Sequence, residues 1–168
     1  MKNNKGFSLV ELIIVIAIIS ILTGVSFVGL SYLYSTNVKS TVQKLDSSLQ
    51  KVQSYTTAKS NGGRDVGLVI KKKSDGFYVE YKGIAGQEDA KIGGQNLTFK
   101  YYVGGTATSI DSTHSLELNF DRSTGGLLPL TNNGSDYCEK IEVSLNGANK
   151  YTITLSKVTG RTEISFFD

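Results

Sequence analysis

The chain is poor in the residues that most metal and redox sites need. Its 168 residues include one histidine, one cysteine, one proline and no tryptophan. Because Cys138 is the only cysteine, an internal disulfide is excluded, and a lone thiol is most often a small buried hydrophobe. His114 has neither a second histidine nor a paired cysteine to complete a zinc site. We therefore predict neither a bound metal nor a cofactor.

Motifs of catalysis are missing as well. The sequence contains no glycine-rich phosphate loop followed by lysine, and no nucleophilic serine flanked by glycines. Its formal net charge is only +3, so there is no electrostatic case for a dedicated nucleic-acid binder. These absences predict that the chain is not an enzyme.

Charge is also absent from one long run, residues 12–38. This run exceeds the roughly 20 residues that a helix needs to span a bilayer. Lys2 and Lys5 precede it with no acidic residue between them, which favours a cytoplasmic N-terminus and an exported C-terminus. We predict a single-pass plasma-membrane segment, with residues 7–38 forming a transmembrane and assembly helix.

The residues in front of the run suggest cleavage on the cytoplasmic side. A secretory signal has a core of about 7–15 apolar residues and is cut beyond it, whereas here Gly6 offers close backbone access before the core. Cleavage after Gly6 would remove residues 1–6 as a leader peptide and create a new amine on Phe7. Glu11 lies four residues further on, on the same helix face.

Glu11 requires an explanation, because an acid inside an apolar helix is costly and indicates a function with a partner. Its natural partner is the ammonium of Phe7, from its own or a neighbouring subunit. The alternative is that Glu11 stays hydrated at the cytoplasmic interface.

Residues 6–12, Gly-Phe-Ser-Leu-Val-Glu-Leu, resemble the processing and methylation motif of type IV pilins and pseudopilins. The resemblance implies that a prepilin peptidase cuts after Gly6 and methylates Phe7, and that Glu11 aligns each incoming subunit. Where major pilins often have a helix-bending proline, this chain has Gly24 and Gly29. Glycine weakens a helix by about 1 kcal/mol relative to alanine, but does not imply a proline kink.

A second helical pattern follows the apolar run. Apolar residues recur at spacings of four and three: Val38, Val42, Leu45, Leu49 and Val52. The pattern predicts an amphipathic helix half over residues 39–60, ending near Ala58 before the sequence Asn-Gly-Gly.

The remaining residues, 61–168, predict an antiparallel sheet whose covered face packs on this helix. Alternation marks strands at residues 77–82, 97–103, 116–120, 141–145 and 151–155, and more weakly at 66–70 and 162–167. Residues 146–149 form a predicted hairpin turn, and the glycine-rich stretches 83–96 and 104–112 are predicted surface loops. The predicted class is α+β, and the resemblance implies the type IV pilin fold.

The C-terminal stretch is similar to minor pilins and pseudopilins of the GspH and FimT type, and the missing cysteine pair favours a Gram-positive source. Some DNA-uptake members of this group carry a second basic residue after a Gly-Arg pair, but here Glu163 follows closely after Arg161. Arg161 and the run Lys71, Lys72 and Lys73 are candidate nucleic-acid contacts. The alternative interpretation is a surface arginine in a turn and three solvated lysines at a strand end.

These patterns predict a structural subunit of a type IV pilus-like filament that serves adhesion, motility or DNA uptake. The partners implied are the lipid bilayer before assembly, other pilin subunits, the prepilin peptidase, and an assembly ATPase with its membrane platform. The mature protein would lie in a pilus at the cell surface. The alternatives are a pseudopilin of a competence or type II secretion system and a single-pass membrane-anchored exported domain.

Overall fold

The computed structural model describes residues 8–58, 65–131, 134–145 and 147–167, without the side chains of residues 24–35, 148, 149 and 167. The chain divides into two compact units, Met1–Ser35 and Thr36–Asp168. One helix, α1 (Leu9–Ala58), contributes to both, and each unit is described by itself.

In the first unit, α1 presents an apolar surface that no other described residue of the unit covers. Every large hydrophobic side chain from Leu9 to Leu22 is 51–76% exposed. The polar side chains here bond within the helix, since Ser20 Oγ donates to the carbonyl of Ile16 at 2.8 Å and Thr23 Oγ1 to that of Ile19 at 2.6 Å. Within the side chains that the structure describes, no helix is long and apolar enough to cross a membrane.

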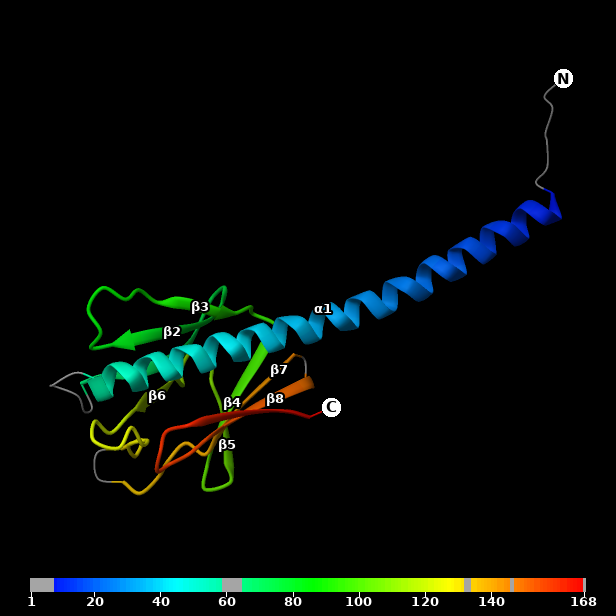
Figure 1. Cartoon of the computed structure of the whole chain (residues 1–168). Coiled ribbons are helices and arrows are strands. Elements are labelled where there is room, and N and C mark those ends of the chain that lie inside the picture. Colours follow the sequence, from blue (N-terminus) through cyan, green and yellow to red (C-terminus); the bar gives the residue numbers. More distant parts are fainter. Residues whose placement is uncertain (1–7, 59–64, 132–133, 146, 168) are drawn as a thin grey trace. The chain divides into compact units, whose positions relative to one another are not determined.

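In the second unit, the C-terminal part of α1 packs on the sheets as the sequence predicts. Val38, Val42, Leu45, Leu49 and Val52 are each at most 1% exposed. They form one core cluster with apolar residues from the strands. The helix is described as far as Ala58, and the cyan part of α1 in Figure 1 lies across both sheets.

The strands form two antiparallel sheets, which confirms the α+β class but corrects the expectation of a single sheet. One sheet has the order β3-β2-β1-β6 and the other β5-β4-β7-β8-β9. The strands are β1 (Gly67–Lys73), β2 (Gly76–Lys82), β3 (Ala90–Gly93), β4 (Leu97–Val103), β5 (Thr106–Ser109), β6 (Leu116–Asn119), β7 (Lys140–Leu145), β8 (Ala148–Leu155) and β9 (Thr162–Phe167).

The two sheets meet through aromatic packing beneath the helix. Phe77 of β2 and Phe99 of β4 stack with ring centroids 4.3 Å apart, and both side chains are buried. An aromatic pair of this kind adds about 0.5–1.5 kcal/mol to the burial of the rings. The sheets therefore share one core instead of forming two separate ones.

Strands β3 and β5 correct a second prediction, because both lie in stretches that were expected to be surface loops. Each has four residues and forms one edge of its sheet. A strand this short carries too few residues for alternation to stand out among glycine-rich neighbours. The weaker candidates, by contrast, are true strands, β1 and β9.

Candidate assembly site at the start of the helix

The first turn of α1 is closed by a reciprocal pair of hydrogen bonds between Ser8 and Glu11. The backbone N–H of Ser8 donates to Oε2 of Glu11 at 2.9 Å, and the backbone N–H of Glu11 donates to Oγ of Ser8 at 3.2 Å. This is a capping box, which satisfies two backbone donors that a helix start leaves unpaired. A carboxylate in this position also interacts favourably with the positive end of the helix dipole.

Glu11 therefore has a local role that the sequence interpretation missed. Serine followed three residues later by glutamate, just before an apolar run, is the sequence signature of a capping box, so the signal was present. Among the described residues, Oε1 of Glu11 accepts no hydrogen bond. The carboxylate can thus cap its own helix with one oxygen and receive a second donor with the other.

The predicted processing site, Gly6 and Phe7, lies outside the described residues. The Phe7 amine that we expect to pair with Glu11 is therefore still a prediction. The described geometry begins one residue later, at the Ser8 cap of α1.

The lysine run at the end of β1 is held in ion pairs. Lys71 lies 2.9 Å from Asp89 and also pairs with Glu80, and Lys73 lies 2.7 Å from Asp89. The hydrogen bonds to Glu80 and Asp89 raise the pKa of Lys71, and those from Lys73 and Lys71 lower the pKa of Asp89. Lys72 instead extends over the ring of Phe77, 5.3 Å from its centroid. Much of the positive charge of this run is thus neutralised by carboxylates on the neighbouring strand β2 and just before β3.

Arg161 and these lysines belong to different sheets. It is exposed in the turn between β8 and β9 of the five-stranded sheet, and its backbone carbonyl accepts from the N–H of Ser156 at 2.8 Å. No interaction among the described residues joins Arg161 to Lys71, Lys72 or Lys73. The four candidate nucleic-acid residues are thus divided between the two sheets.

The remaining reactive side chains take structural positions. Cys138 is 1% exposed, and burial raises the pKa of its thiol to about 12. His114 lies in a loop with Nδ1 3.2 Å from Oδ1 of Asp111. Over the part of the chain that the structure describes, no three His, Cys, Asp or Glu side chains are grouped as metal ligands.

Comparison with known protein families finds a match at the N-terminal end. Residues 1–27 match the prokaryotic N-terminal methylation motif. This motif marks type IV pilin-like proteins, pseudopilins included. No curated protein and no solved structure matches the chain.

The match agrees with the resemblance found in residues 6–12 and covers the capping box and the exposed apolar turns of α1. In pilin-like proteins the motif implies processing by a prepilin peptidase and assembly with other pilin subunits. Such proteins are structural components and not enzymes.

Proposed function

We propose that this pilin-like chain is a structural subunit of a type IV pilus-like filament, processed after Gly6 and N-methylated at Phe7. The observation that carries the proposal is the bare apolar surface of α1 from Leu9 to Leu22. An apolar surface of this extent requires either lipid or another protein as its cover. A bundle of identical helices supplies such a cover, and a bilayer supplies it before assembly.

Membrane residence and assembly would use the same surface in succession. The uncharged run of residues 12–38 has the length of a membrane anchor. We propose that the precursor lies in the plasma membrane with its N-terminus inside and its sheets outside. Extraction then exchanges lipid contacts for helix contacts, driven by an assembly ATPase and its membrane platform.

Glu11 would set the position of each incoming subunit. Inside a bundle of apolar helices, an unpaired carboxylate costs several kcal/mol. The capping box occupies Oε2, so Oε1 is the atom that we expect to receive the Phe7 ammonium. A subunit placed out of register would leave both charges buried and unpaired, which disfavours that arrangement.

The two sheets of the second unit would form the filament exterior and carry its contacts with the surroundings, in adhesion, motility or DNA uptake. Because Lys71 and Lys73 are held in ion pairs, their charges do not favour DNA uptake over adhesion or motility. A pseudopilin of a competence or secretion system would use the same helix in a shorter filament.

Mass spectrometry of the mature protein tests the processing step. We expect a chain that begins at N-methylated Phe7, and an intact Met1 or a start beyond residue 23 would contradict the proposal. Electron microscopy with an antibody to residues 65–131 tests the assembly step. Labelling along filaments indicates a main subunit, sparse or tip labelling indicates a minor one, and a protein confined to the membrane would contradict filament assembly.

A further inference from the structure

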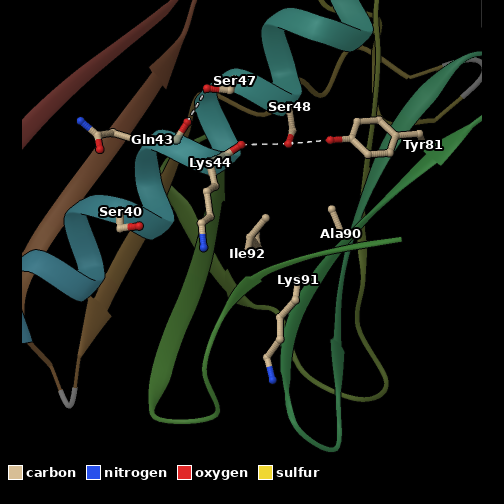
Figure 2. Close-up of a pocket in the computed structure, with 9 residues that line it drawn as sticks. All are labelled: Ser40, Gln43, Lys44, Ser47, Ser48, Tyr81, Ala90, Lys91 and Ile92. Carbon is tan, nitrogen blue, oxygen red and sulfur yellow. Dashed lines mark hydrogen bonds between the residues drawn. The ribbon is translucent and has the colours of Figure 1, made fainter. Parts of the chain in front are cut away.

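A groove of about 470 Å³ lies between α1 and the edge strand β3 (Figure 2). Small-molecule sites in proteins commonly have volumes of about 300–1,000 Å³. Nine residues of the second unit line the groove: Ser40, Gln43, Lys44, Ser47, Ser48, Tyr81, Ala90, Lys91 and Ile92.

Contacts between helix and sheet fix the groove near both of its ends. Near one end, Oγ of Ser48 and the hydroxyl of Tyr81 are hydrogen-bonded at 2.9 Å. Near the other, β3 comes so close to the helix that a Cβ on Gly93 would lie 3.2 Å from Cγ2 of Thr41. Because these contacts fix the separation of α1 and the strands, the groove is a permanent feature of the fold.

The groove has an apolar floor below a polar rim. Figure 2 shows Ala90 and Ile92 pointing from β3 toward the helix, and Ile92 is only 3% exposed. The rim carries the exposed side chains of Ser40 and Ser47, and because the Ser47 hydroxyl donates to the carbonyl of Gln43 at 2.8 Å, its oxygen is left to accept from a ligand. This combination suits a ligand that has both C–H surface and hydroxyl groups, as a sugar ring does.

One cation at the groove, that of Lys44, has no partner among the residues that the structure describes. Lys44 extends from the helix toward β3 in Figure 2, and it makes no ion pair or side-chain hydrogen bond with any residue that the structure describes. The ammonium of Lys91, by contrast, lies 2.8 Å from Asp75. None of the nine lining residues carries a carboxylate. The groove therefore favours a ligand with a negative charge.

We propose that this groove binds an anionic sugar. Its carboxylate or phosphate would pair with the Lys44 ammonium, its hydroxyls would bond to Ser40 and Ser47, and one face of its ring would rest on Ile92 and Ala90. This site belongs to the second unit alone and does not depend on filament assembly.

Titration calorimetry with the full-length protein, in a detergent without a sugar headgroup, tests the charge requirement. The probes are glucuronate, glucose 6-phosphate and neutral glucose. We expect glucose to bind at least about tenfold more weakly than an anionic sugar, because a neutral sugar cannot form the charge-assisted hydrogen bond to the Lys44 ammonium. Binding of glucuronate alone identifies a carboxylate ligand, and binding of glucose 6-phosphate alone identifies a phosphate ligand.

Two lysine variants locate the charge. Lys44→Gln should weaken binding of the anionic sugar about tenfold or more. Lys39→Gln removes the same charge from an exposed position on the same helix that does not line the groove, and it should leave binding unchanged. Absent binding of both anionic sugars, equal binding of glucose, or equal effects of the two variants would overturn the proposal.

A second pair of variants tests the groove without changing charge. Ala90→Leu places a larger side chain above the floor and should abolish binding. Ala107→Leu makes the same change on β5, the edge strand of the other sheet, and should have no effect on binding. Urea unfolding establishes that both variants are folded. A folded Ala90→Leu protein that binds like the wild type would show that the ligand does not occupy this groove.

Discussion

The side-chain amide of Gln53 lies in the space that a side chain on Gly160 would need. A Cβ built on Gly160 would fall 2.6 Å from Nε2 of Gln53 and 2.1 Å from the carbonyl oxygen of Gly125. The amide donates to that carbonyl at 2.8 Å and to the carbonyl of Thr159 at 2.7 Å. Gln53 thereby ties α1 to the loop after β6 and to the turn between β8 and β9.

We predict that Gly160→Ala destabilises the protein more than a glycine replacement that strains the backbone alone. Gly160 has a φ of 63°, where a Cβ costs about 1–2 kcal/mol. The clash of the added Cβ with the Gly125 carbonyl should lower the free energy of unfolding by about 1–3 kcal/mol more, as overpacking does. Gly105→Ala is the matched control, since its φ is 78° but nothing lies within 4 Å of the added Cβ. Equal unfolding free energies of the two variants in urea would contradict the steric argument.

Removing the Gln53 amide should loosen two loops while leaving the core in place. Gln53→Ala loses two hydrogen bonds worth about 1 kcal/mol each. Hydrogen exchange should therefore become faster in residues 121–126 and 156–160, with little change in β7. Gln50→Ala is the control, because Gln50 lies on the same helix and, among the described residues, its amide bonds to Asp46 alone, at 2.9 Å. Faster exchange throughout the sheets would indicate that Gln53 supports the whole unit and not the two loops.

The helix could be predicted well from the sequence, because its core face repeats every three or four residues and needs no knowledge of distant partners. Val38 to Val52 follow this rule. Strand pairing does not follow from such a rule, since β4 pairs with β7, some 40 positions further along the chain. Alternation predicts that Phe77 and Phe99 are buried, but it does not assign their strands to different sheets.

Individual polar residues on the helix were harder to predict. Asp46 lies outside the apolar repeat of the helix, which favours exposure to solvent, yet it is half-buried and accepts a hydrogen bond from Thr162 of β9. Gln53 likewise contacts two loops that are distant in sequence. A local sequence pattern does not reveal contacts with residues that are distant in the sequence. The Ser8 and Glu11 pair differs, because both members lie within one turn and their spacing is diagnostic.

The loop after β6 should make stability depend on pH in the acid range. Oδ1 of Asp121 accepts hydrogen bonds from Ser123 and Thr124, which lower the pKa of this carboxyl to about 2. A group whose pKa is lower in the folded state stabilises the protein above its unfolded pKa of about 3.9. This stability is lost as the pH falls through the folded value.

We therefore expect Asp121→Asn to be less stable than the wild type at pH 7, with the difference shrinking between about pH 4 and pH 2. Ser123→Ala removes one donor and should give an intermediate curve. Thermal unfolding across this pH range measures the effect. A difference between Asp121→Asn and wild type that stays constant from pH 7 to pH 2 would show that the ionised carboxylate is not the source of the stability.

The two roles assigned to Glu11 can be separated by two variants, one at each member of the capping box. Glu11→Gln keeps an oxygen that can accept from the Ser8 N–H, but it removes the charge that pairs with the Phe7 ammonium. Ser8→Ala keeps the charge and removes the hydroxyl that accepts from the Glu11 N–H at 3.2 Å. The first variant tests subunit alignment, and the second tests capping of the helix.

If alignment by charge governs assembly, Glu11→Gln should be processed normally yet form at least about tenfold fewer filaments, as expected for the loss of a charge-assisted bond. Ser8→Ala should assemble close to the wild-type level, because the loss of a cap costs only about 0.5–2 kcal/mol and the bundle holds the helix in place. Filaments are counted by electron microscopy, after mass spectrometry has established cleavage after Gly6 in both variants. The reverse result, with Glu11→Gln assembling normally and Ser8→Ala failing, would make the capping box the whole function of this carboxylate.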